Sequence, residues 1–402
     1  MELLKRNKIL TGALAVLVIV GIGCYIAQLV GGLAMTGMNN GTSWGLYITC
    51  FMFFVGLSAG GLIVASSASI FHIKKFKQVA MPAVILSTVC ICVAGMFVLI
   101  DLGGLQRVWR IVTGPNPTSP LVWDICVITC YLVINIFYLH FMRVKNDHAV
   151  SIVSRFALPV AILVHSVTAW IFGLENAKEG WYTAILAPIF VASALDSGLA
   201  LLLLALTALR KKGIFQVSQD LIASLAGLLA TCVAVDAFFI GCELLTMAYP
   251  GTAGSSLILS ELTAGPTAPF FWIEILCGLV LPFCILVFAK NRQSSTLVCA
   301  ASGLIILGVF FKRIWLLFTS FITPDVYGAP GIISGSSAAA HAQGVDSFAV
   351  LSSYAPTAIE VFVVIGVVSL GVLAFMALTG WLIQDKGSAE AEGQAAAAPA
   401  NA

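Results

Sequence analysis

Residues 79–100 read VAMPAVILSTVCICVAGMFVLI, an apolar stretch without one charged side chain. At 1.5 Å per residue, a helix of about 22 residues is about 33 Å long, enough to cross the ~30 Å hydrocarbon core of a bilayer. Because hydrocarbon does not hydrogen-bond an exposed amide, such a stretch must satisfy its own backbone, which a helix does within one segment. The stretch therefore predicts a transmembrane helix.

The same pattern recurs along the whole chain, which is 60% hydrophobic and only 9% charged over 402 residues. This composition leaves too little polar material to cover a soluble globule, so lipid must be the solvent. The apolar runs are continuous, unlike the alternating segments of about ten residues that a β-barrel needs. We predict an all-α, polytopic membrane protein. Its ten predicted spans are 9–30, 45–71, 79–100, 121–142, 152–173, 182–209, 220–246, 269–289, 296–320 and 355–382.

Lysine and arginine alternate between the two ends of these spans, as the positive charge bias of cytoplasmic loops requires. Of the 20 basic residues, 15 fall at one set of ends. We expect that set to face the cytoplasm of a bacterium, which places both termini on the cytoplasmic side of its inner membrane. The set comprises Lys5, Arg6, Lys8, Lys74, Lys75, Lys77, Arg143, Lys145, Arg155, Arg210, Lys211, Lys212, Lys290, Arg292 and Lys386.

The two ends of the chain are expected to differ in kind. The first run follows basic residues as a secretory signal does, but it is longer than a usual signal core and lacks a clear small-x-small exit, so we expect a retained helix. Residues 385–402, which include AEAEGQAAAAPANA, have no apolar face to bury. They predict a disordered cytoplasmic tail.

No motif indicates a metal site or a redox centre in this chain. All eleven cysteines lie in apolar runs, and their spacings match no iron–sulfur pattern. Haem needs histidines at one depth on facing helices, and His165, about 20 Å from the cytoplasmic end of its helix, is not level with His140 at the margin. A haem between His72 and His140 at the inner surface remains an alternative. There is no phosphate-binding loop, and we expect no nucleic-acid partner.

Ionisable residues inside a span are costly unless they have a partner or a wet cavity, so each is a candidate functional residue. Most of them lie towards the non-cytoplasmic half, with Asp196 and Asp236 nearer the middle. The candidates are Asp124, His165, Asp196, Asp236, Glu243, Glu274, Lys312, Arg313 and Glu360, with Asp101 and Arg107 at the outer end of the third span.

Asp236 and Glu243 are seven residues apart, which places both carboxylates on one helix face, two turns from each other. This spacing suits a proton relay, or two salt bridges to Lys312 and Arg313. The alternative is an ion-pair network that only holds the helices together.

Residues 101–124, DLGGLQRVWRIVTGPNPTSPLVWD, are the most distinctive stretch of the chain. Its prolines and glycines exclude a helix over 103–120, and its arginines and tryptophans are typical of a membrane interface. By itself this pattern predicts an ordered surface connection, which could be simply an interfacial anchor.

The stretch also resembles the Asp-Leu-Gly, Arg, Trp and Asn-Pro-Thr-Ser-Pro pattern of the polysulfide reductase/NrfD family of membrane subunits, in its ten-helix branch. Other segments are similar to that family in the same order, and together they cover about residues 44–380. They are WGLYITCFMFFVGLSAGG at 44–61, HSVTAWIFGLENAKEGWYTAILAPIFVASALDSGLALLL at 165–203, FW-x-E at 271–274, Lys312-Arg313, and Tyr354-Ala-Pro-Thr-x-x-Glu360.

The resemblance implies two four-helix bundles with flanking helices. It divides the chain into a flanking helix and outer loop at 1–43, a first bundle at 44–173, a second bundle at 174–320, an outer loop at 321–354, a last helix at 355–384 and the tail at 385–402. It also implies a quinone pocket, for menaquinone or ubiquinone, in the first bundle near the non-cytoplasmic face. No haem or iron–sulfur cluster would belong to this chain.

The partners implied by the resemblance are a ferredoxin-like iron–sulfur subunit and a catalytic subunit such as a molybdoenzyme, a hydrogenase or a multihaem cytochrome. The chain would then be one subunit of a respiratory oxidoreductase rather than a complete enzyme. The direction of electron flow and the final substrate would depend on those partners.

On this resemblance, Asp101 and His165 are the candidates that hydrogen-bond the quinone oxygens and exchange protons with them. Arg107 would orient Asp101 or the loop, while Trp44 and Asp124 would line the entrance. The second bundle would conduct protons through Asp196, Asp236, Glu243, Glu274, Arg313 and Glu360. Residues 48–52 lack the Asn and His that some eight-helix members carry on the equivalent helix, so those two roles do not transfer.

A secondary transporter or proton-conducting carrier is the alternative class, because two helical bundles with buried carboxylates also describe many carriers. A carrier is expected to have a pair of Gly/Pro-interrupted helices in corresponding positions. The chain lacks that pair, and its GPNPTSP loop lies between spans. The pattern therefore favours the quinone-linked subunit.

Overall fold

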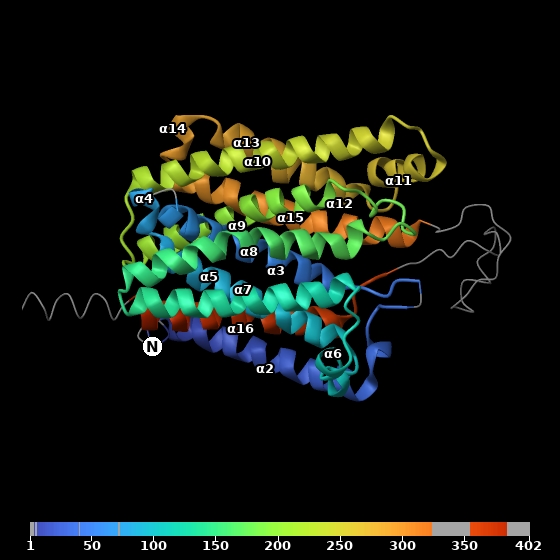
Figure 1. The fold of residues 1–402 in the computed structure, drawn as a ribbon, viewed down its shortest axis with the longest axis horizontal. Coiled ribbons are helices and arrows are strands. Elements are labelled where there is room, and N and C mark those ends of the chain that lie inside the picture. The colour runs from blue at the N-terminus through green and yellow to red at the C-terminus, as the bar shows by residue number, and fades with distance from the viewer. Residues whose placement is uncertain (1–3, 5, 40, 71–72, 324–353, 384–402) are drawn as a thin grey trace, which may run out of the picture.

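The computed structural model describes residues 4, 6–39, 41–70, 73–323 and 354–383, and these form helices and connections without a strand. Ten spans run from end to end of the molecule, and consecutive spans alternate in direction (Figure 1). They are α2 (Lys8–Gly31), α3 (Leu46–Ile70), α5 (Ala80–Asp101), α7 (Pro120–Arg143), α8 (Asp147–Gly173), α9 (Leu186–Lys211), α10 (Gln219–Ala248), the three-part span α12 (Ala268–Ile273), η3 (Glu274–Val280) and α13 (Leu281–Leu286), α15 (Ser295–Ile322) and α16 (Ala358–Leu382). The predicted all-α fold and its ten spans are confirmed, with bounds that shift by five residues or fewer.

The first bundle consists of α3, α5, α7 and α8, each packed against two of the others. Within it α3 is the most deeply buried span. The terminal helices α2 and α16 pack against each other and cover α5 from outside, along one edge of the molecule in Figure 1. Both flanking helices therefore extend the first bundle.

The second bundle consists of α9, α10, the span α12–η3–α13, and α15, and α15 contacts all the others. The two bundles meet mainly along α3 and α9, with α8 and α15 adding contacts. Side chains on the facing sides of these four helices are therefore shielded from lipid.

The α3–α9 crossing is close because two glycines meet there. A methyl group at Gly60 would lie 2.5 Å from Leu199 N and 2.6 Å from Gly198 Cα, and one at Gly198 would lie as close to the backbone of Gly60. Small residues let helices in lipid approach until their backbones touch. This contact sets the distance between the two bundles.

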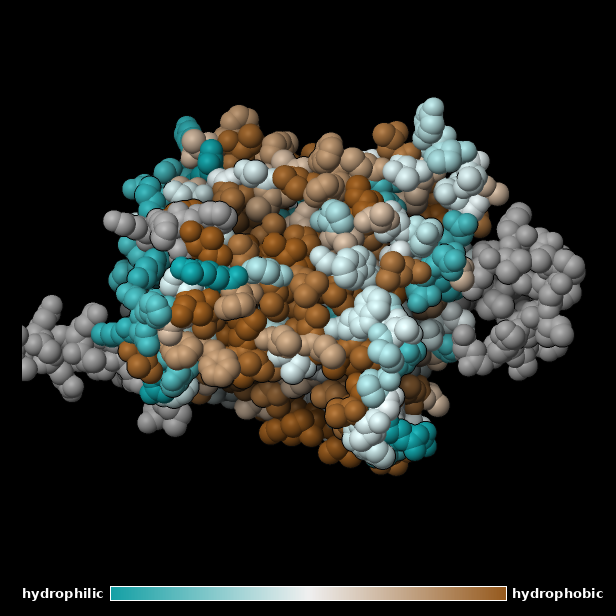
Figure 2. Space-filling view, viewed as in Figure 1, coloured by the Kyte–Doolittle hydropathy of each residue, from teal (hydrophilic) through white to brown (hydrophobic). Residues whose placement is uncertain are grey.

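The surface has the pattern of a membrane-spanning protein. Figure 2 shows a belt of apolar side chains around the middle and hydrophilic ones gathered at both ends. Large exposed side chains of the spans include Phe137, Phe156 and Phe238. The end that holds α4 (Lys74–Lys77) and α14 (Ala289–Arg292) is called the basic end below, and the end that holds α6 (Arg110–Thr113) and α11 (Ala253–Ala264) the outer end.

The connection 103–120 differs from its prediction, because it is not free of helix. Residues Leu105–Arg107 and Arg110–Thr113 form two short helical turns. The three prolines of the connection all follow Thr113, so they do not interrupt the turns before it. The predicted tail 385–402, most of the predicted loop 321–354, and His72 of the alternative haem site lie outside the described residues.

We predict that Gly60→Ala will lower the stability of the purified chain by about 1–3 kcal/mol, because its methyl group overpacks the backbone contact with α9. Reversible unfolding in mixed micelles measures this loss. Gly95→Ala is the matched control, since Gly95 is a helical glycine of α5 with nothing within 4 Å of the added methyl group. Equal stability of the two variants would show that the α3–α9 contact does not limit the fold.

Candidate functional site

A buried ion pair joins three helices of the second bundle. Lys312 of α15 is 1% exposed, and its Nζ lies 2.9 and 3.0 Å from the two carboxylate oxygens of Asp236 on α10. Glu274 Oε1 lies 3.4 Å from the same ammonium group. Inside a membrane an unpaired charge is very costly, so Lys312 binds α10 and the eighth span to α15.

The Asp236–Lys312 pair is one of the two salt bridges that the seven-residue spacing predicted. Glu243 does not make the other one. It accepts a hydrogen bond from Thr183 Oγ1 at 2.9 Å, near the outer end of α10. The second anionic partner of Lys312 is Glu274, which lies on another helix and so could not be found from a spacing within α10.

Glu274 begins a π-helical segment, Glu274–Val280, in the middle of the eighth span. A π-helical turn widens the helix, and such segments are frequent at functional sites. Gly278 of this segment meets α15 closely, since a methyl group at Gly278 would lie 2.7 Å from Gly308 Cα. The close approach brings Glu274 against Lys312 and against Trp315, whose indole N–H donates to its carboxylate.

Asp196 of α9 completes this group, because its fully buried carboxyl faces Asp236. We call Asp196, Asp236, Glu274, Lys312 and Arg313 the ionic cluster. It contains three carboxyls and two cations.

Arg313 connects the ionic cluster to the first bundle. Its Nη2 donates to Ser193 Oγ at 2.7 Å, and its guanidinium lies 4.0 Å from the ring centroid of Phe190. His165 of α8 is its electrostatic neighbour. Arg313 Nε and Nη1 and His165 Nε2 are buried and have no hydrogen-bond partner within the described chain. Buried polar atoms of this kind are usually bonded to ordered water, so this region between the bundles is suited to hold water.

A second polar group lies at the outer end, where α16 begins. Glu360 accepts hydrogen bonds from Gly37 N and Thr357 N, both at 2.8 Å, and from the Tyr354 hydroxyl at 2.6 Å. The same hydroxyl accepts one from Leu46 N at 2.8 Å. Burial raises the pKa of Tyr354, and the adjoining Glu360 raises it further, so the hydroxyl keeps its proton and donates. Glu360 thereby fixes the start of α16 against α3.

This position corrects the placement of Glu360 expected from the sequence. The resemblance groups it with the second bundle, whereas α16 packs on α2 and α5, and Glu360 bonds to residues beside the first bundle. Its electrostatic neighbours include Asp101 and Tyr47 rather than the ionic cluster.

Asp101, the last residue of α5, lies beside this outer-end group. Its Oδ1 atom is buried and has no hydrogen-bond partner within the described chain. Nearby, the Tyr47 hydroxyl donates to Gln28 Oε1 at 2.5 Å, and Gln28 Nε2 donates to Ile100 O at 3.4 Å. Asp101 Oδ1 is therefore a buried acceptor atom that no group of the described chain occupies.

An apolar groove lies between α2, α5 and α16, and Asp101 itself is not among its lining residues. Its volume is about 260 Å³, and its lining includes Ile100, the residue before Asp101. Tyr25, Met96, Leu99 and Val363 are among the other lining residues. Leu99 is 42% exposed, so the groove opens on the lipid-facing surface.

The remaining residues of the predicted entrance lie apart from this groove. Asp124 of α7 accepts a hydrogen bond from Thr168 Oγ1 of α8 at 2.7 Å. Trp44 belongs to an aromatic cluster, with its ring centroid 5.5 Å from that of Phe172 and 6.1 Å from that of Trp181. Thr168 and Phe172 both belong to α8, so Asp124 and Trp44 each contact that helix.

Asp101 and His165 are the predicted pair of quinone contacts. No hydrogen bond or ion pair among the described residues joins them, and their electrostatic neighbours are Glu360 and Arg313 respectively. Arg107 is exposed, and no ion pair with Asp101 is present in the described chain. None of the three lines the apolar groove, but Asp101 directly follows Ile100, which does.

Sequence reasoning missed Gln28 and Tyr47 and left Lys312 out of the predicted proton route. Gln28 is the one side-chain amide in the run 9–30, and a polar residue in a span is a usable signal. Tyr47 gave no such signal, because it begins an aromatic-rich helix.

Such a fold, with ten spans in two bundles and charged groups held between helices, defines a class of polytopic membrane proteins. Residues 34–325 match the family Polysulphide reductase, NrfD, and the chain belongs to this family. The resemblance found in the sequence is confirmed.

Three relatives match most of the chain. A protein of Halobacterium salinarum assigned as a dimethyl sulfoxide reductase membrane subunit is 35% identical, over 91% of this chain and 89% of that protein. The Hdr-like menaquinol oxidoreductase integral membrane subunit of Archaeoglobus fulgidus is 28% identical, over 89% of each chain. A selenate reductase subunit of Mesobacillus selenatarsenatis is 24% identical, over 92% of each chain. All three names refer to oxidoreductase complexes.

We predict that Lys312→Met will destabilise the chain by about 3–5 kcal/mol, because it leaves the buried carboxylates of Asp236 and Glu274 without their cation. Unfolding in mixed micelles measures the loss, and adding Asp236→Asn to Lys312→Met should restore part of it. Lys77→Met is the control, since its ion pair with Asp147 is exposed and worth at most about 1 kcal/mol. A loss as small as that of the control would mean that the ionic cluster does not hold the helices.

Proposed function

We propose that the chain is the membrane subunit of a quinone-linked oxidoreductase complex and that a quinone or quinol headgroup binds beside Asp101. The observation that carries this proposal is the buried Oδ1 of Asp101, which has no partner within the described chain and follows directly after Ile100, a lining residue of the apolar groove. A quinone with an isoprenoid tail needs an apolar path that ends at a polar partner, and the groove and the carboxyl supply both. The name of the A. fulgidus relative makes menaquinol the first ligand to test.

When bound, the quinone couple supplies two-electron, two-proton redox chemistry. Asp101 would accept or donate one of the protons at Oδ1. Tyr47 and Gln28 would keep the surroundings of that carboxyl ordered through their mutual hydrogen bond. Tyr25 on the wall of the groove would flank the ring.

We further propose that an iron–sulfur partner receives or delivers the electrons at the outer end. The connection 103–120 directly follows Asp101, and it presents exposed Arg107, Trp109 and Arg110 to a partner. A third subunit would carry out the substrate chemistry, as the names of the relatives suggest. The basic end would face the cytoplasm, together with the start of α2 and the end of α16.

The ionic cluster and His165 form a proposed proton route that is separate from the quinone site. It would run from His165 and Arg313, between the bundles, through Asp196 and Asp236 to Glu274. The unpartnered polar atoms of His165 and Arg313 support hydration at its first-bundle end. On this proposal His165 would act in proton transfer rather than at the quinone oxygens.

A carrier is less well supported. The eighth span is interrupted at Glu274–Val280, but α3, α5, α7 and α8 of the first bundle are continuous helices, so the interruption has no counterpart there. The three relatives above are also all named for oxidoreductases.

We predict that Asp101→Asn will lower menaquinol-linked turnover of the purified complex by about 100-fold or more, because the amide cannot accept the quinol proton. Electron transfer to an artificial acceptor, measured spectrophotometrically, provides the rate. Asp220→Asn, an exposed carboxyl in the first turn of α10, is the control and should leave the rate unchanged. Turnover within about twofold of the unaltered complex in Asp101→Asn would refute the assigned quinone site.

We also predict that Glu274→Gln will abolish most proton transfer coupled to turnover while quinol oxidation continues, because the substitution keeps the side-chain shape and removes one titrating carboxyl from the route. Proteoliposomes containing the complex and a pH-sensitive dye report protons moved per electron. The control is Glu175→Gln, an exposed residue at the outer end. An unchanged proton-to-electron ratio in Glu274→Gln would exclude the ionic cluster from the route.

A further inference from the structure

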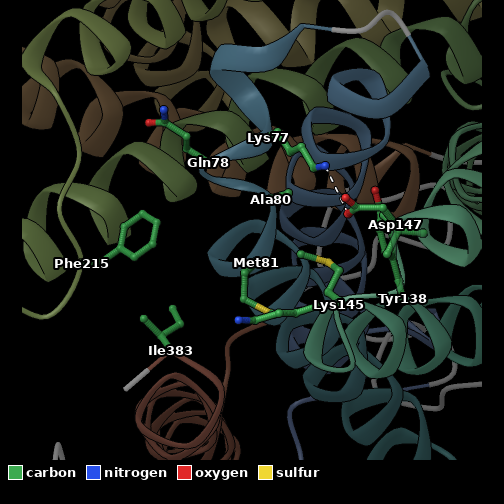
Figure 3. Close-up of a pocket in the computed structure, with 11 residues that line it drawn as sticks. Lys77, Gln78, Ala80, Met81, Tyr138, Lys145, Asp147, Phe215 and Ile383 are labelled. Atoms are coloured by element: carbon green, nitrogen blue, oxygen red, sulfur yellow. Dashed lines mark hydrogen bonds and ion pairs between the residues drawn. The ribbon is translucent and has the colours of Figure 1, made fainter. Parts of the chain in front are cut away.

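A cavity of about 330 Å³ lies at the basic end, away from both the quinone groove and the ionic cluster (Figure 3). It is bounded by the start of α5, the end of α7, the start of α8, the connection after α9 and the end of α16. Most of its lining is apolar and includes Met81, Tyr138, Met142, Val150, Phe215 and Ile383. The cavity therefore combines a membrane-end position with walls suited to methylene groups.

Three charged side chains line this cavity, and their sum is positive. Lys77 Nζ is paired with Asp147 Oδ1 at 3.2 Å, as the dashed line in Figure 3 marks. Lys145 has no hydrogen bond or ion pair through its ammonium group within the described chain, and Figure 3 shows it extending across the cavity towards Met81 and Ile383. One positive charge is left to be matched by a ligand.

Lysine is an unusual residue for the backbone conformation at position 145. It lies at φ 58°, the one positive φ of a non-glycine residue among those described, and Asn146 N donates to Phe141 O at 3.0 Å to close the end of α7. α9 ends with the same hydrogen-bond pattern, and there Gly213 occupies this position at φ 69°. Glycine is the favoured residue at such a helix end, so α7 keeps a lysine where it is strained.

Two neighbouring features place the cavity at the membrane–water boundary. The Arg143 guanidinium lies 4.0 Å from the ring centroid of Trp381, and tryptophan and arginine are typical of that boundary. Basic pockets between membrane helices bind anionic lipid headgroups.

We propose that this cavity binds one anionic phospholipid, with its phosphate on Lys145, Lys77 as the second cation, and its first methylene groups against Met81 and Ile383. The bound lipid would join α5 and α7 to the end of α16. The proposal depends on the membrane fold and is independent of the quinone site.

The test uses the purified full-length chain with phosphatidylglycerol, phosphatidylcholine or inorganic phosphate. Native mass spectrometry should show one retained phosphatidylglycerol, which should also raise the midpoint of thermal unfolding, whereas the other two additives should do neither. Lys145→Gly should weaken phosphatidylglycerol binding by about fivefold or more, because it removes a cation at the membrane surface. In phosphatidylcholine its midpoint should equal or exceed that of the unaltered chain, because glycine relieves the strain at this position.

Lys211→Gln, an exposed basic residue at the same end and outside the cavity, is the control and should retain phosphatidylglycerol fully. Undiminished retention by Lys145→Gly would overturn the proposal. An equal effect of phosphatidylcholine, or of inorganic phosphate alone, would also overturn it. A chain shortened after residue 386 provides a further test. If it retained more phosphatidylglycerol than the full-length chain, the removed residues would be the native occupant of the cavity, and the proposal would be overturned.

Discussion

Hydrocarbon offers no hydrogen bond to a buried ammonium group, and this constraint organises the second bundle around Lys312. Asp236 and Glu274 must both come within reach of one side chain, so α10 and the eighth span have to pack against α15 at one depth. The π-helical segment and the contact of Gly278 with Gly308 make that approach possible. The ionic cluster thus holds these three spans together through ion pairs to one ammonium group.

The first bundle meets the same constraint in a different way. Its outer-end carboxyls, Glu360 and Asp101, are served by backbone N–H groups and hydroxyls at the start of α16, or are left open beside the apolar groove. The flanking helices α2 and α16 form two of the three walls of that groove. The flanking helices α2 and α16 lie outside the two bundles, yet they supply most of the residues that line the groove of the proposed quinone site. His165 of α8 is the first-bundle neighbour of Arg313 in the ionic cluster.

Several site contacts followed from local patterns, and others did not. The spacing of Asp236 and Glu243 correctly indicated a carboxylate facing Lys312, because two turns of one helix are a local geometry. The partner on the eighth span was not foreseen, since nothing within 269–289 shows that its helix opens into a π turn at Glu274. The resemblance grouped Glu360 with the second bundle, whereas α16 packs on α2 and α5. The position of Glu360 along α16 indicates its depth in the membrane but does not indicate which helices lie next to it.

The sequence by itself determined the ten spans, their alternating direction and the family, because span length, charge bias and ordered motifs are properties read along the chain. Only the tertiary structure decided which faces meet: the Gly60–Gly198 crossing, the contact of Glu274 with Lys312, and the groove that α2 and α16 form against α5. In lipid every outward face is apolar, so hydrophobicity does not choose between neighbours. Small residues and a few polar pairs, far apart in the chain, make that choice.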